Sequence, residues 1–121
     1  MILYRKISEE TIMIKMQIIM DDEKILREKK YSLAKIHATL DNYFINQLNI
    51  SKGQDGFYIG SGAKGDFGNF GLAMWTLGKK AWFMENVKTW LYFNSEDSDD
   101  PNDFVIEDFK EFCTQKYQFS A

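Results

Sequence analysis

The sequence contains only one cysteine, one histidine and one proline among its 121 residues. Cys113 therefore has no partner for an intramolecular disulfide. A lone cysteine and a lone histidine are also too few ligands for a zinc site. These shortages exclude a disulfide framework and a zinc centre within the chain, and we expect neither a metal nor another cofactor.

Long apolar runs are missing as well. The most apolar stretch, residues 12–20, contains Lys15 and Gln17 and is far shorter than the roughly 20 residues that a membrane-spanning helix needs. At the N-terminus, Arg5 and Lys6 interrupt the sequence before any signal-like apolar core develops. We therefore expect a cytoplasmic protein that has no membrane partner.

Positive charge is scarce. Fifteen Lys and Arg residues against eighteen Asp and Glu residues give a formal net charge of −3 and a pI near 5.1. Such a balance disfavours phosphate backbones and anionic membranes as partners. We expect no direct binding of nucleic acid.

The length, with 45% hydrophobic and 16% aromatic residues, is typical of one compact domain spanning residues 1–121. The two halves differ in character. Residues 1–50 read as a mainly helical half, whereas residues 56–121 hold all three Trp residues and most of the carboxylates. No repeat or linker divides the chain.

Hydrophobic spacing and capping residues predict the elements. Ser8 and Ser32 precede apolar repeats typical of helices, and Asp100–Pro101 is a favourable helix start. We expect helices over about 9–20, 23–30, 33–49, 80–92 and 102–117, and strands over 57–59 and 70–77. The 23–30 helix carries little apolar surface. The predicted fold class is α+β, with three to four helices packed on a small β-sheet in a single compact domain.

A glycine-rich segment, Gly60-Ser61-Gly62-Ala63-Lys64-Gly65, follows the predicted strand 57–59 and has the spacing of a dinucleotide-binding loop. That motif also requires a following helix, a second parallel strand and an acidic residue about 20 positions further on. Glu85 has that distance, but it lies in the predicted helix 80–92, and the chain is too short for the fold. Binding of a small ligand or nucleotide at Gly60–Gly65, with turnover through His37, is the alternative function. His37 is better explained as a helix-surface or core residue, and Cys113 as a buried thiol with a raised pKa.

Carboxylates concentrate between residues 96 and 111, where eight of them stand with the single Lys110. A calcium loop starting at Asp97 would place Pro101 and Asn102 at positions that the motif reserves for a ligand and a glycine, so it does not fit. Two interpretations remain. The cluster either keeps the domain soluble or attracts a basic partner by imitating nucleic-acid phosphates.

The stretch Trp82–Asp97, followed by Pro101–Phe104 and Glu107–Phe109, resembles small immunity proteins of bacterial polymorphic-toxin and contact-dependent growth inhibition systems. The likeness covers residues 67–112. It implies a cytoplasmic antidote, not an enzyme, that binds a cognate toxin domain and occludes its active site or substrate groove. Such a toxin is often a ribonuclease that acts on tRNA, and a basic nuclease domain would suit an acidic partner.

Our leading hypothesis from the sequence is therefore a toxin-binding immunity protein. We expect the contact to be made by seven carboxylates and two neighbouring aromatic residues: Glu96, Asp97, Asp99, Asp100, Asp103, Glu107, Asp108, Trp90 and Tyr92. A third possibility is a regulatory module that binds a helper protein through an exposed apolar stripe on the predicted helix 9–20.

Overall fold

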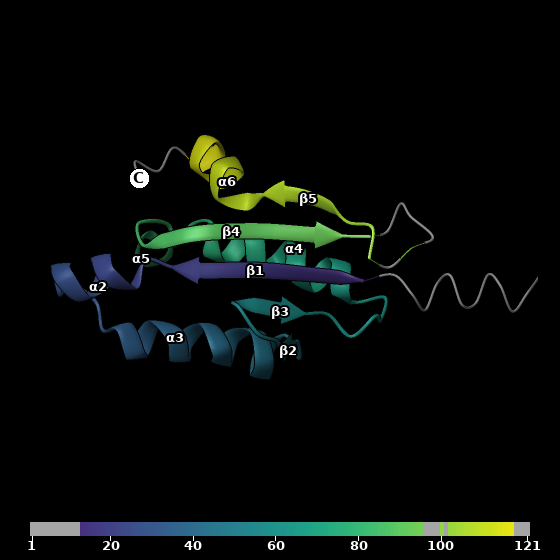
Figure 1. Ribbon diagram of the computed structural model, residues 1–121, viewed down its shortest axis with the longest axis horizontal. Helices are drawn as coiled ribbons and strands as arrows, with labels where there is room; N and C mark the ends of the chain where they lie inside the picture. Colours follow the sequence, from purple (N-terminus) through teal and green to yellow (C-terminus); the bar gives the residue numbers. More distant parts are fainter. Residues whose placement is uncertain (1–12, 96–99, 101, 118–121) are drawn as a thin grey trace, which may run out of the picture.

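The computed structural model describes residues 13–95, 100 and 102–117, and its longer strands lie side by side in one sheet (Figure 1). The strands are β1 (Ile14–Met20), β2 (Ser51–Lys52), β3 (Phe57–Ile59), β4 (Val87–Asn94) and β5 (Val105–Asp108). The helices are α2 (Asp22–Glu28), α3 (Leu33–Asp41), α4 (Asp66–Leu77), α5 (Ala81–Met84) and α6 (Phe109–Tyr117), with a π-helical turn at Asn42–Gln47.

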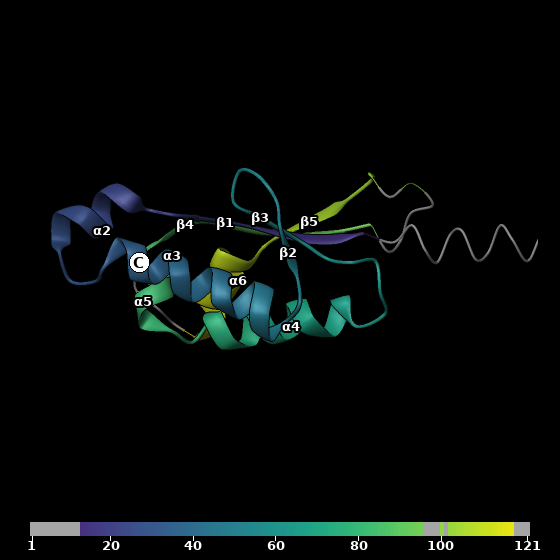
Figure 2. The same cartoon turned by 90° about the horizontal axis from the view of Figure 1, so that it is seen from below.

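The five strands lie in the order β2-β3-β1-β4-β5, and every neighbouring pair is antiparallel. Figure 2 shows α3, α4 and α6 below the sheet, so these helices cover one sheet face, and among the described elements no helix covers the other, which we call the open face. The predicted α+β class is confirmed.

The central strand β1 corrects the prediction of a helix over 9–20, of which residues 9–12 lie outside the described residues. Every second side chain from Ile14 to Met20 is buried, as in a strand with one covered face. The spacing of Met16, Ile19 and Met20 also fits a helix, so the local pattern was ambiguous. Pairing with β3 and β4 fixed the strand conformation. Met16 and Met20, two residues of the stripe that the helper-protein hypothesis needed exposed, are buried, whereas Ile19 is half-buried on the other sheet face.

The second half contains three further corrections. The predicted helix 80–92 is a single turn, α5, followed by β4, and the predicted helix 102–117 is β5 followed by α6. The predicted strand 70–77 belongs to α4, where Phe70, Ala73 and Leu77 are buried at helical spacing. We had predicted a strand from the alternation of side chains over residues 70–77. The buried residues are instead spaced three and four positions apart, and this spacing extends back to Asp66.

Other predictions are confirmed. The Ser32 hydroxyl oxygen accepts a hydrogen bond from the backbone N–H of Lys35 at 3.3 Å and caps α3. The helix predicted over 23–30 is α2, and the strand 57–59 is β3. The short strand β2 is not among the strands that we predicted.

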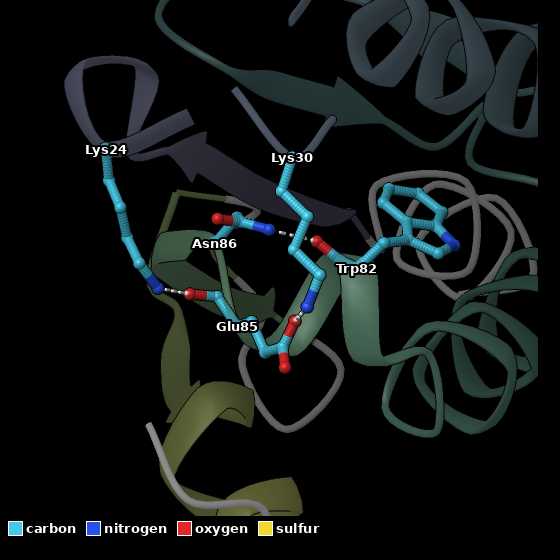
Figure 3. Close-up of polar contacts among 5 residues, drawn as sticks. All are labelled: Lys24, Lys30, Trp82, Glu85 and Asn86. Carbon is cyan, nitrogen blue, oxygen red and sulfur yellow. Dashed lines mark hydrogen bonds and ion pairs between the residues drawn. The ribbon is translucent and has the colours of Figure 1, made fainter. Parts of the chain in front are cut away.

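A polar junction ties α2 to the chain between α5 and β4 (Figure 3). The Lys24 ammonium donates a hydrogen bond to the backbone carbonyl of Glu85, and the Glu85 carboxylate lies 3.6 Å from the Lys30 ammonium. The buried Asn86 side chain donates to the Trp82 carbonyl at 2.8 Å. These contacts hold α2 beside the start of β4.

The turn before β3 depends on Gly56, whose φ is +80°. A Cβ added there would lie 2.5 Å from the Ile18 carbonyl oxygen. We expect Gly56→Ala to lower the free energy of unfolding by about 1–3 kcal/mol, because alanine is strained in this conformation and clashes with β1. Urea denaturation measures the change.

The control is Gly68→Ala in α4, where an added Cβ meets nothing within 4 Å. Alanine is the better helix former, so this variant should gain up to about 1 kcal/mol. Equal shifts of the two urea midpoints would contradict the assignment of Gly56 as a conformationally required glycine.

Candidate protein-binding site

The described part of the acidic cluster lies at one edge of the sheet. Asp100, Asp103, Glu107 and Asp108 are all exposed. Glu96, Asp97 and Asp99, which we also predicted as partner contacts, lie outside the described residues. The structure therefore places four of the seven predicted carboxylates on or just before β5.

Two of these carboxylates also organise the backbone. The Asp108 side chain accepts a hydrogen bond from the backbone N–H of Glu111 at 3.0 Å, as an N-cap residue does at the start of α6. The Asp100 side chain accepts one from the N–H of Asn102 at 2.9 Å. Asp100 and Asp108 thus stabilise the local backbone. Within the described ranges we find no such hydrogen bond to the side chain of Asp103 or Glu107.

The chain entering β5 is anchored on the open sheet face through Phe104. The Phe104 ring packs edge-on against Phe93, with 5.8 Å between ring centroids. The Lys15 ammonium lies 4.7 Å from the Phe104 centroid and 4.6 Å from that of Phe57. Residues from β1, β3 and β4 therefore fix the position at which β5 begins.

Strand β5 is an exposed edge strand. It pairs with β4 on one side and is last in the strand order, so within the described part of the chain no strand pairs with its outer edge. Val105 and Ile106 are each 55% exposed, although β-branched apolar residues usually favour burial. An accessible edge with apolar side chains is a template for another chain.

The predicted aromatic contacts need correction, because Trp90 and Tyr92 are buried. Trp90 is 0% exposed and packs edge-on against Phe83 and Phe109. Tyr92 is 6% exposed and stacks on Phe109 at 4.8 Å. Both side chains point to the helix-covered face of β4, because residues two positions apart on a strand share a face. Trp90 therefore cannot form part of a binding surface, and Tyr92 is accessible only as part of the lining of a groove.

That groove runs between α4 and the β4–β5–α6 edge and was not predicted. Its volume is about 250 Å³. The residues that shape it include Phe67, Gly71, Met74, Tyr92, Glu107 and Phe112. Sequence reasoning missed the groove because residues 70–77 were predicted to form a strand and Phe112 was predicted to lie on the apolar face of the last helix, whereas Phe112 is 47% exposed.

The glycine-rich segment Gly60–Gly65 connects β3 to α4, and its hydrogen-bond donors point inward. The backbone N–H of Gly62 donates to Asp66 at 2.8 Å, and the Ser61 hydroxyl donates to the same carboxylate at 3.2 Å. Asp66 is 5% exposed. The Asp66 side chain thus takes up donors that a bound phosphate would need. The helix α4 follows the segment directly, as the motif requires, but β3 runs antiparallel to β1.

The isolated reactive residues have structural explanations, as predicted. His37 is exposed on α3, with Nε2 3.2 Å from the Asp22 carboxylate. Cys113 is fully buried, and burial raises the pKa of its thiol to about 11.

A polar pair that the sequence did not reveal joins α3 to β3. The Tyr58 hydroxyl donates a hydrogen bond to Asp41 at 2.7 Å. Burial and the Asp41 carboxylate raise the pKa of Tyr58. Burial acts to raise the pKa of Asp41, but hydrogen bonds from Tyr58 and Lys52 outweigh it, so the pKa lies below its usual value.

Comparisons add no relative: no protein-family model, curated protein or solved structure matches the chain. Within the described ranges, no group of three or more His, Cys, Asp or Glu side chains is arranged to hold a metal ion. None of the helices there combines the length and hydropathy needed to span a bilayer.

We expect dinucleotides to leave the melting temperature of the wild type unchanged, because the Asp66 carboxylate would repel a pyrophosphate at Gly60–Gly65. A thermal-shift titration with NAD measures this. Stabilisation that Gly62→Val abolishes would contradict this account of the loop.

Cys113 generates a pH prediction. Its folded-state pKa of about 11 exceeds the ordinary value of 9.0, so the folded state retains the proton longer than the unfolded chain. The contribution of the protonated Cys113 thiol to the free energy of unfolding is fully present below pH 9.0 and is lost as the pH rises through about 11. Wild type should therefore lose free energy of unfolding more steeply over that window than Cys113→Ala. Urea titrations at each pH measure both, and parallel curves would contradict the prediction.

Proposed function

We propose that this protein is a cytoplasmic immunity protein that binds and neutralises a cognate toxin domain, a basic ribonuclease that acts on tRNA. The observation that carries the proposal is the exposed edge strand β5, which presents apolar and acidic side chains to solvent together. The likeness of residues 67–112 to immunity proteins of toxin systems supports the same class.

The side chains of β5 suit a cationic protein. Glu107 and Asp108 lie on the strand, and Asp103 lies just before it, so a partner segment beside β5 would meet several negative charges. Such charges accelerate association with a basic surface and disfavour wrong partners. A nuclease that holds RNA phosphates presents such a surface.

The apolar side chains of β5 favour a protein partner over a bound polycation. Val105 and Ile106 lose their contact with water when another chain covers them, which stabilises a complex. The backbone N–H and C=O groups along the outer edge of β5 can pair with an added strand. Binding at this edge would neutralise the toxin by covering its substrate groove, with no chemistry by the immunity protein.

The test takes the product of the gene immediately upstream as the candidate toxin and uses it, purified, as an inactive variant. Wild type should bind it with one-to-one stoichiometry and should rescue growth when coexpressed with the active toxin. Asp103→Lys combined with Glu107→Lys should lower the association rate by about tenfold or more at low salt, because the electrostatic attraction is reversed. Stopped-flow kinetics at two salt concentrations measure the rates, and high salt should narrow the difference.

The matched control reverses two exposed carboxylates on α2, Glu23→Lys combined with Glu28→Lys. This variant has the same net charge as the β5 variant but leaves the β5 edge intact. It should associate at nearly the wild-type rate. Equal slowing by both variants would assign the effect to net charge, and no effect of the β5 variant would remove this surface from the interface.

A further inference from the structure

The groove between α4 and the β4–β5–α6 edge is built around a glycine that the fold does not require. A Cβ added at Gly71 meets nothing within 4 Å, and Gly71 is not in the left-handed region. Glycine is a poor helix former, and Gly71 lies in the interior of α4. A side chain at Gly71 would project into the groove, so glycine there keeps the groove open.

The groove is lined mainly by apolar side chains, together with the amide of Asn94. Phe67 from α4 and Phe112 from α6 stand on either side, 61% and 47% exposed. Met74 and Tyr92 also line the groove. An exposed aromatic pair beside an open apolar floor offers contact area to an inserted side chain.

The groove lining carries one charge, and the Lys116 ammonium lies near it, 5.5 Å from the Phe112 ring centroid. Glu107 is the only charged residue among the described residues that line it. Glu107 pairs with Tyr92 across β5 and β4, and strand alternation places both side chains on the helix-covered side of the sheet. The groove therefore combines an apolar floor with one carboxylate, which is complementary to an apolar side chain that has a cation beside it.

We propose that this groove receives one aromatic or large aliphatic side chain of the toxin, flanked in the toxin sequence by a Lys or Arg that pairs with Glu107. This inference rests on the proposed function and names the chemistry of the partner segment. Because Glu107 belongs to β5, one continuous segment of the toxin can pair along the strand edge and place this side chain in the groove. The groove thus selects among basic toxins, which the carboxylates alone would not do.

The first experiment fills the groove with a new side chain. Gly71→Leu should weaken binding of the inactive upstream-encoded toxin domain by about tenfold or more, with the melting temperature unchanged or raised. The matched control is Gly68→Leu on the same helix, where an added Cβ also meets nothing within 4 Å but which does not line the groove. It should bind within about twofold of wild type. Equal affinities of Gly71→Leu and wild type would overturn the inference and leave the proposed function standing.

A second experiment needs no toxin. Two capped dipeptides, N-acetyl-Phe-Arg-amide and N-acetyl-Phe-Glu-amide, are titrated to about 10 mM, the range expected for such small ligands. Amide NMR signals of Gly71, Tyr92 and Glu107 should move with the Arg dipeptide, much less with the Glu dipeptide, and not in Gly71→Leu. Equal effects of the dipeptides, or no shift at these amides, would overturn the inference. If the Arg dipeptide binds but the toxin domain does not, the proposed toxin would be rejected, whereas the inferred preference of the groove for an apolar side chain beside a cation would stand.

Discussion

Burial of the Trp90 indole is the interaction on which the rest of the structure depends. Trp90 is 0% exposed, and its Nε1–H points at the Met16 sulfur atom, 3.1 Å away. Its ring packs edge-on against Phe83 at 4.9 Å and Phe109 at 5.6 Å. One side chain thereby joins the central strand β1, its neighbour β4, and the two helices α5 and α6. Truncating a buried Trp typically costs about 3–5 kcal/mol, a large share of the stability of a small domain.

The same contacts place the candidate site. Phe109 packs on Trp90 and Tyr92, and it is the first residue of α6, so the aromatic core fixes the point where β5 ends. On the opposite face, Lys15 and Phe93 hold Phe104 where the chain approaches β5. The exposed edge is therefore held at one end by the core and at the other end by contacts on the opposite sheet face, which lets four solvent-facing residues keep a defined geometry for a partner.

The sequence correctly predicted those features that depend on residues close together in the chain. Ser32 as a cap, the strand at 57–59 and the acidic character of the C-terminal half could all be read from neighbouring residues. The strands β1 and β4 could not be read in this way, because their apolar residues also fit helical spacing and their pairing joins residues about 75 positions apart, such as Met16 and Tyr92. Tertiary pairing overrode the local pattern.

The candidate site was predictable in its charge and unpredictable in its shape. The exposure of Asp103 and Glu107 follows from the cost of burying carboxylates. Trp90 was wrongly predicted as a partner contact, because an aromatic residue beside an acidic run can lie either in a core or at an interface. Its position on the helix-covered face of β4, which the sequence did not reveal, places it in the core. The groove depends on α4 and α6 meeting at the sheet edge, and no local pattern encodes that contact.

Hydrogen exchange in the free protein and in its complex with the toxin domain tests the central claim most directly. If the β5 edge and the adjoining groove form the interface, amides of residues 103–112 and 67–74 should exchange more slowly in the complex, and those of α2 and α3 should not change. Protection confined to α2 and α3, with β5 exchanging as fast as in the free protein, would contradict the account.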